Sequence, residues 1–141
     1  MSRRDIQIID IHTLEAFKIE SQVGRYQLVT GYGALSILSK MNDIQAEFCL
    51  ANCVFSHSAG DKGAAVENLL DDIESRLEFY KDHRFFPTTS GSGYEELIWV
   101  MKEQSIETPR ILAVSTRNDF GLEVASWFDR AEAQLAEEAT K

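Results

Sequence analysis

The clearest pattern of apolar and polar positions along the chain runs over residues 61–82. Apolar side chains recur there at helical spacing, which predicts one long amphipathic helix; they are Val66, Leu69, Leu70, Ile73, Leu77 and Tyr80. Asp61 or Ser58 can cap its start, because a side-chain oxygen there accepts a hydrogen bond from a backbone N–H. Acidic residues fall off the stripe and form an outer face; they are Glu67, Asp71, Asp72, Glu74 and Glu78.

Before this helix the pattern favours strands. Residues 6–11 are rich in β-branched side chains, and residues 26–30 alternate between two faces. Residues 34–40 are interpreted as a second short strand, paired with the preceding one as a hairpin. Residues 44–56 form the longest predicted strand. Residues 12–20 fit either a short helix or a strand edge, and we favour a strand or an irregular link.

After the long helix the chain favours helices. Residues 84–93 predict a loop, and Ser92 with Glu95 forms a capping box that opens a helix to about Gln104. The apolar residues 111–114 predict a short strand, and residues 122–139 a last helix. Strands first and helices later indicate an α+β fold: a mainly antiparallel sheet of about five strands, with about three helices packed on it. A chain of 141 residues is expected to form a single domain, 1–141.

The charge of the chain limits its partners. The net charge is −9, which makes direct binding of nucleic acid unfavourable, since phosphates are met by Lys and Arg. An acidic surface permits a protein partner, and a basic one in particular. The first residues contain no apolar segment after their arginines, and no apolar run approaches the length of a membrane span. We therefore expect a cytoplasmic protein with no membrane contact.

The residue types that carry catalysis or bind metals show no specific motif. Cys49 and Cys53 lie on the predicted long strand, where a spacing of four residues separates them by roughly 13 Å. That distance excludes a disulfide or a shared metal, so both are predicted to be buried thiols. His12, His57 and His83 share no ligand spacing. We predict no catalytic residue, no metal site and no cofactor.

Two junctions between a loop and a helix are candidate anion sites. The first is the predicted loop that ends at a helix start and follows Arg84; it consists of Thr88, Thr89, Ser90, Gly91, Ser92 and Gly93. Backbone N–H groups and the helix dipole favour a phosphate or carboxylate at such a place. The second is the turn with Gly60 and Gly63, between the long strand and the long helix.

The second junction resembles the acyl-coenzyme A site of the GCN5-related N-acetyltransferases. The likeness lies in the order of a strand, a glycine-bearing turn and a long helix, and Asn118 after the strand 111–114 matches a further position of that family. Gly60 stands where the family has Gln or Arg. The resemblance implies that backbone N–H groups of this turn hold the pyrophosphate of an acyl-coenzyme A.

Two function classes follow. The first is a small protein of the inhibitor, immunity, chaperone or regulatory type that binds another protein. Its acidic helix face (Glu67, Asp71, Glu74, Glu78) would steer the partner, and Phe85 and Phe86 would anchor it. The alternative is an enzyme or sensor that binds an anionic ligand, an acyl-coenzyme A or a nucleotide, at one of the two junctions. A homo-oligomer with Trp99 or Trp127 at its interface is a third hypothesis.

Overall fold

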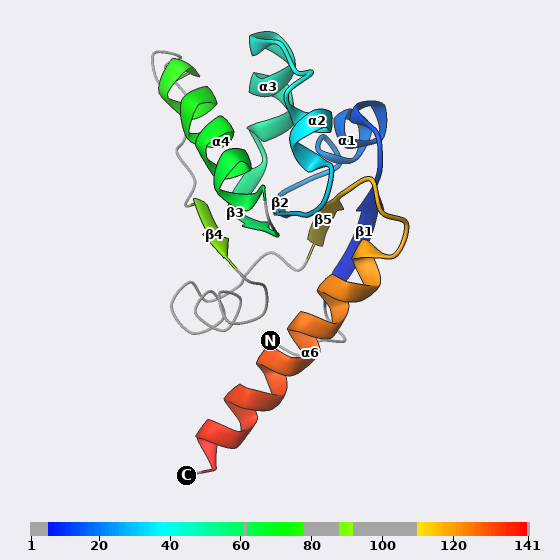
Figure 1. Ribbon diagram of the computed structural model, residues 1–141, viewed down its shortest axis with the longest axis vertical. Coiled ribbons are helices and arrows are strands. Elements are labelled where there is room, and N and C mark those ends of the chain that lie inside the picture. The colour runs from blue at the N-terminus through cyan, green and yellow to red at the C-terminus, as the bar shows by residue number, and fades with distance from the viewer. Residues whose placement is uncertain (1–5, 61, 78–87, 92–109, 141) are drawn as a thin grey trace.

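The computed structural model describes residues 6–60, 62–77, 88–91 and 110–140 (Figure 1). The strands are β1 (Gln7–Ile11), β2 (Tyr26–Thr30), β3 (Cys53–Ala59), β4 (Thr88–Gly91) and β5 (Arg110–Val114). The helices are α1 (Leu14–Glu20), α2 (Ala34–Leu38), α3 (Asp43–Leu50), α4 (Gly63–Leu77) and α6 (Phe120–Ala139). Helices thus alternate with strands over the first half of the chain.

The five strands form one sheet in the order β1-β5-β2-β3-β4, and every pair is parallel. β5 lies between the first two strands of the chain, with Leu112 in register with Ile9 on one side and Leu28 on the other. Over the described residues the sheet has five strands, which agrees with the predicted number of about five, but the predicted mainly antiparallel arrangement is wrong. Parallel neighbours need a crossover connection, usually a helix, and the crossover helices before β3 were interpreted as strands.

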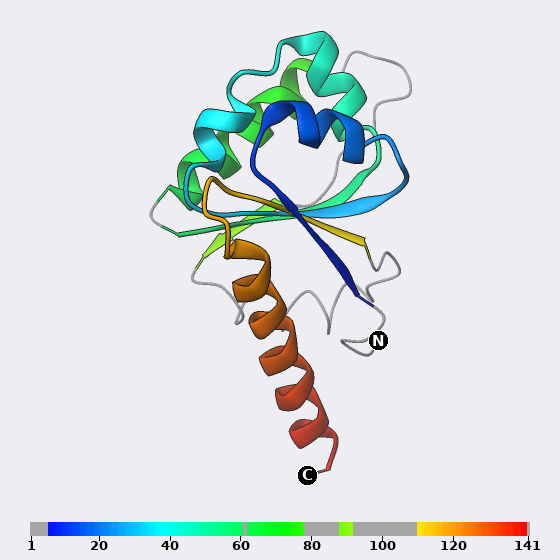
Figure 2. The ribbon, with the colours of Figure 1, turned by 90° about the vertical axis from the view of Figure 1, so that its right-hand side faces the viewer.

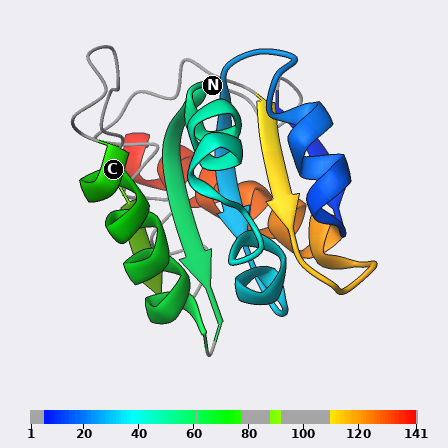
Figure 3. The same cartoon turned by 90° about the horizontal axis from the view of Figure 1, so that it is seen from above.

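The helices divide between the two faces of the sheet. Figures 2 and 3 show α1, α2, α3 and α4 on one face, and α6 on the other. The core under the four helices joins Leu28 and Val114 of the sheet to Leu70 of α4. The smaller core on the opposite face joins Val29 and Ala113 to residues of α6. Side chains of one strand alternate between these cores, as the pleat requires.

Three segments before β3 differ from their predictions. Residues 34–38 form the helix α2, and residues 14–20 form the helix α1, which was the alternative we did not favour. The predicted strand 44–56 consists of the helix α3 and the start of β3. Every second residue from Ile44 to Leu50 is apolar, which favours a strand. Only Ala46 and Leu50 of these are buried, whereas Ile44 and Phe48 are exposed. This is the pattern of a helix that is buried on one side.

A local signal marks the start of α3. Asn42 accepts a hydrogen bond from Gln45 N, and Asn42 N donates to the Gln45 side chain, which together make a capping box. Such a box satisfies two N–H groups that a helix start leaves without partners. The sequence Asn-x-x-Gln at residues 42–45 therefore indicates a helix more strongly than the alternating apolar residues after it indicate a strand.

The segment 88–91 also differs from its prediction. It forms β4, an edge strand that pairs with β3, where the sequence predicts a loop. Its residues are hydroxyl-bearing or glycine, so it lacks the β-branched apolar pattern by which strands are identified. The strand is therefore stabilised by its pairing with β3 and not by the strand preference of its own residues.

Other predictions are confirmed. α4 buries Val66, Leu70 and Ile73 of its predicted stripe. The last helix buries Val124, Trp127, Phe128 and Ala131. The predicted strands 6–11, 26–30 and 111–114 correspond to β1, β2 and β5. As a separate finding, none of the helices in the described part of the chain combines the length and the apolar character of a membrane span.

The start of α6 is held by a carboxylate from a distant strand. Gly121 N donates a hydrogen bond of 2.7 Å to Asp10 Oδ1. A Cβ on Gly121 would lie 2.3 Å from that carboxylate, so glycine permits the approach. The N-cap residue Asp119 makes no side-chain cap bond. Asp10 therefore supplies the negative charge that the first turn favours.

Replacement of Asp10 by Ala is expected to lower the free energy of unfolding by about 1 kcal/mol, because the helix start loses a charged acceptor. Urea unfolding of the two proteins measures the difference. Asp10→Asn keeps an acceptor oxygen but not the charge. Its free energy of unfolding is expected to lie between those of the parent protein and Asp10→Ala. Equal stability of Asp10→Ala and the parent protein would contradict this role.

Candidate functional site

All five parallel strands end on the same side of the sheet, which we call the carboxyl edge. At one point of this edge, the chain leaves two adjacent strands in opposite directions. After β2 the chain enters α2 on one face, and after β5 it enters α6 on the other (Figure 2). The connections therefore diverge at neighbouring strands. In open parallel sheets, ligands bind in the crevice that such a divergence leaves at the carboxyl ends.

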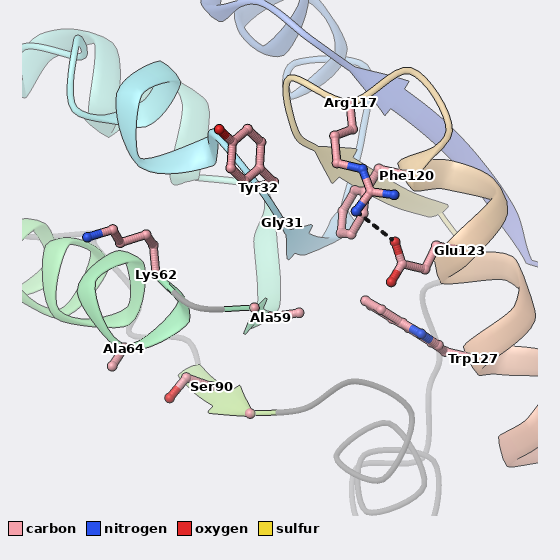
Figure 4. Close-up of a pocket in the computed structure, with 12 residues that line it drawn as sticks. Gly31, Tyr32, Ala59, Lys62, Ala64, Ser90, Arg117, Phe120, Glu123 and Trp127 are labelled. Atoms are coloured by element: carbon pink, nitrogen blue, oxygen red, sulfur yellow. Dashed lines mark ion pairs between the residues drawn. The ribbon is translucent and has the colours of Figure 1, made fainter.

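A pocket of about 740 Å³ lies at this edge. It draws residues from the ends of β2, β3 and β4 and from the start of α6 (Figure 4). Its lining consists of Gly31, Tyr32, Ala59, Gly60, Lys62, Ala64, Ser90, Gly91, Arg117, Phe120, Glu123 and Trp127. The volume falls in the range of small-molecule sites.

The two loops that border the crevice are tied together by hydrogen bonds. The carbonyl oxygen of Tyr32 accepts from Ser115 Oγ at 2.7 Å and from Thr116 N at 2.9 Å. Gly31 N donates to Val114 O at 2.9 Å. Gly33 has φ +82, and a Cβ there would meet the Thr116 side chain at 2.2 Å. Hydrogen bonds within the protein therefore hold this wall of the pocket in place without a ligand.

One wall of the pocket is aromatic. The rings of Phe120 and Trp127 meet edge to face with centroids 5.8 Å apart. Gly31 lies against Phe120, because a Cβ on Gly31 would be 2.5 Å from the ring. In Figure 4 the indole of Trp127 extends from α6 toward the pocket. Tyr32 stands at the rim and is 72% exposed.

The lining carries two cations and one carboxylate. Arg117 Nε lies 3.4 Å from Asp119 Oδ1, and Arg117 Nη1 lies 3.8 Å from Glu123 Oε2. These pairs are long and half-exposed, and such pairs contribute about 0.2–1 kcal/mol each. An anionic ligand can therefore compete for the guanidinium. Lys62 lies at the opposite rim, where its side chain extends away from Arg117 (Figure 4).

The turn between β3 and α4 brings the backbone close to itself. Gly60 has φ +86, a conformation that glycine adopts without strain. Gly63 N donates to Gly60 O at 3.0 Å. A Cβ on Gly63 would lie 2.5 Å from the carbonyl oxygen of Ser58. The backbone geometry thus explains why glycine occupies both positions of the predicted junction. The first turn of α4 lies directly against the end of β3.

The structure brings the two predicted anion junctions together at one edge. Gly60, Ser90 and Gly91 line the same pocket, because β4 pairs with β3. Gly63 begins α4, and Thr88 and Thr89 belong to β4. The remaining members of that set, Arg84, Ser92 and Gly93, lie outside the described residues.

The predicted protein-binding face is only partly where the sequence placed it. Asp71 is exposed and Glu67 is half-buried. Glu74 is 6% exposed, so its assignment to the outer face is wrong: it follows Ile73 on the side of α4 that packs on the sheet. The other three members, Glu78, Phe85 and Phe86, lie outside the described residues.

Sequence reasoning missed the residues of the pocket that follow β2 and β5. These are Gly31, Tyr32, Arg117, Phe120 and Glu123. The available signal is positional, since residues just after parallel strands gather at the carboxyl edge. This rule applies only to parallel strands, so it points to none of these residues when an antiparallel sheet is predicted. Asn118, the position of the acetyltransferase resemblance, lies in the same loop as Arg117 and is exposed.

Both cysteine thiols are buried as predicted, but the prediction that they share one strand is wrong, because Cys49 lies in a helix. Cys49 of α3 and Cys53 of β3 are free and buried, and burial raises the pKa of both thiols. They therefore stay protonated and unreactive. Burial also lowers the pKa of His57 to about 4. Over the described part of the chain, no group of three or more His, Cys, Asp or Glu residues could hold a metal ion.

Comparison of the chain with protein-family models, with curated proteins and with solved structures found no match. The resemblance to the GCN5-related N-acetyltransferases thus rests on the order of a strand, a turn and a helix alone.

Replacement of Gly63 by Ala is expected to lower the free energy of unfolding by about 1–3 kcal/mol, because the new Cβ meets backbone that cannot move without shifting α4. Thermal or urea unfolding measures the change. Gly24→Ala is the matched control, since a Cβ at Gly24 meets nothing within 4 Å. Similar stability of the two variants would show that the contact at Gly63 is not tight.

The buried His57 predicts a dependence of stability on pH. Its pKa is about 4 in the folded protein and about 6.5 when unfolded, so the unfolded chain binds the extra proton between these values. Stability is complete above pH 6.5 and is lost as the pH falls toward 4. We expect a loss of about 2 kcal/mol between pH 7.5 and 5. Urea unfolding at the two pH values measures it.

His57→Gln serves as the control for this pH effect. The variant has no imidazole to protonate, so the change between pH 7.5 and 5 is expected to shrink by most of that amount. An unchanged pH dependence in the variant would assign the effect to other groups.

Proposed function

We propose that this protein binds a small anionic organic ligand in the pocket at the carboxyl edge of its sheet. The observation that carries the proposal is the position of the pocket. It lies where β2 and β5, adjacent parallel strands, send the chain to opposite faces, which is the usual ligand site of open parallel sheets.

The chemistry of the lining supports an anion. Lys62 and Arg117 oppose a single carboxylate, that of Glu123, among the lining residues. The chain as a whole has a net charge of −9, so the lining has the opposite balance from the rest of the molecule. Cationic groups in a cleft concentrate anionic ligands near it.

The remainder of the lining supports an organic ligand with an apolar or aromatic part. Phe120 and Trp127 are buried to 3% and 8% exposure and offer ring edges and faces that pack against apolar surface. Five residues of the lining are glycine or alanine; they are Gly31, Ala59, Gly60, Ala64 and Gly91. Their small side chains let a ligand approach the backbone. Nucleotides and coenzyme A esters combine these properties.

Binding of a protein partner through the acidic face of α4 stays a prediction. The burial of Glu74 removes one of its four carboxylates from the surface, which weakens the basis for electrostatic steering. The ligand pocket rests on more of the described residues, and we therefore place it first.

The test is a thermal-shift screen of the protein against nucleotides, coenzyme A esters and simple anions. A ligand at 100 times its Kd stabilises the folded state by about 2.7 kcal/mol, which gives a clear and dose-dependent rise in Tm. Arg117→Ala is expected to raise the Kd about tenfold or more, because it removes a charged donor from the lining.

Arg76→Ala is the matched control for Arg117→Ala. Arg76 is also paired with two carboxylates, those of Asp72 and Asp43, but lies near the opposite end of α4, about 20 Å along the helix from its start. The control is expected to bind the ligand as the parent protein does. A flat screen, or equal losses in both variants, would contradict a site at this edge.

A further inference from the structure

Two side chains of opposite charge stand next to each other on one wall of the pocket. Arg117 Nη1 lies 3.8 Å from Glu123 Oε2, which is longer than an N–H···O hydrogen bond. The two side chains are 51% and 40% exposed, and both line the pocket (Figure 4), so a ligand can reach them. This polar pair (Arg117 and Glu123) therefore offers N–H donors and carboxylate acceptors side by side.

The guanidinium of the polar pair is held from another side by Asp119. Arg117 Nε lies 3.4 Å from Asp119 Oδ1, and Arg117 Nη2 donates to Asp119 Oδ2 at 3.5 Å. One guanidinium thus faces two carboxylates, and this wall carries no excess of positive charge. A neutral group that has both acceptors and donors suits the wall better than a phosphate does.

The opposite rim of the pocket is the better place for an anionic group. Lys62 lies there, and its side chain extends away from Arg117 (Figure 4). None of the ion pairs within the described ranges involves Lys62. Glu123, the carboxylate of the described lining, belongs to α6 on the other side. The ammonium group of Lys62 is therefore a point charge that a phosphate can use.

Aromatic surface lies beside the polar pair. Phe120, Glu123 and Trp127 follow one another on α6 at intervals of three and four residues, so they share one face of the helix. Tyr32 lines the same pocket and is exposed at its rim. A planar heterocycle at the polar pair therefore has aromatic side chains near it, and stacking on such a ring contributes about 1–3 kcal/mol per base.

We infer that the pocket binds a guanine nucleotide, with the base at the polar pair and the phosphate at Lys62. The inference rests on the proposed function and narrows its anionic ligand to one class. Guanine carries the acceptor O6 next to two donors, N1–H and the amino group at C2. Arg117 donates to O6, and the two oxygens of Glu123 accept from N1–H and from the amino group. Hydrogen bonds to a charged partner are the stronger ones.

The other common purines present a different edge to the same two side chains. Adenine has an amino group in place of O6 and an acceptor nitrogen in place of N1–H. Its amino group would face Arg117 and its ring nitrogen would face Glu123, with no hydrogen bond at either position. A site built for hydrogen bonds rejects a ligand that leaves its polar groups unpaired. Hypoxanthine keeps O6 and N1–H but lacks the amino group, so it isolates one hydrogen bond.

The test compares the binding of GMP, IMP, AMP and guanosine by isothermal titration calorimetry. The parent protein is expected to bind GMP at least about tenfold more tightly than each of the other three, since each lacks a group that the pocket recognises. In Glu123→Gln the preference for GMP over IMP is expected to fall to about twofold or less, because an amide has one acceptor oxygen. Lys62→Ala is expected to weaken GMP about tenfold and to leave guanosine unchanged.

Glu137→Gln is the matched control for Glu123→Gln. It removes an exposed carboxylate from the same helix, about 21 Å further along its axis. The control is expected to bind all four compounds as the parent protein does. The inference is supported if GMP binds most tightly, if only Glu123→Gln loses the preference for GMP over IMP, and if Lys62→Ala weakens GMP alone.

Two results would overturn the inference and leave the proposed function standing. In the first, AMP or a coenzyme A ester binds as tightly as GMP and loses affinity in Arg117→Ala. In the second, Glu123→Gln keeps the preference of the parent protein for GMP over IMP. If no nucleotide, coenzyme A ester or simple anion raises the Tm of the parent protein, both proposals fail.

Discussion

The placement of β5 between β1 and β2 is the constraint on which the rest of the structure depends. Residues Ile111–Val114 are completely buried and pair with a parallel strand on either side. Without β5 the first two strands of the chain would have no common neighbour. Because the chain leaves β5 toward α6 while it leaves β2 toward α2, the same placement creates the divergence at which the pocket lies.

The carboxyl edge combines close backbone contacts with groups suited to a ligand. Gly31 against Phe120 and Gly63 against Ser58 leave no room for a Cβ, and the Tyr32 carbonyl is held by two residues that follow β5. Such a framework fixes the positions of the pocket residues in advance, which lowers the ordering cost of binding. Asp10 accepts a hydrogen bond from the start of α6, whereas Lys62 lies just before the start of α4, so the two sides of this edge differ in charge.

The sequence predicts the long elements of this fold and misses its topology. α4 and α6 are identified because their apolar stripes extend over several turns. α2 has only five residues, too few for helical spacing to be distinguished from a strand. In α3, the alternation of Ile44 to Leu50 masks a helix whose start is marked by Asn42 and Gln45. With those helices taken as strands, the parallel order could not be derived, and neither could Arg117 and Phe120 of the pocket.

The most direct measurement of the central claim is a titration of the ¹⁵N-labelled protein with inorganic phosphate, followed by ¹H–¹⁵N NMR. The account predicts saturable shifts of the backbone amides at the carboxyl edge, with the largest at Gly60, Gly63 and Ser90. Amides near the amino ends of the strands, such as that of Gly24 just before β2, are expected to stay in place. Shifts that do not saturate, or that gather away from the carboxyl edge, would contradict an anion site in this pocket.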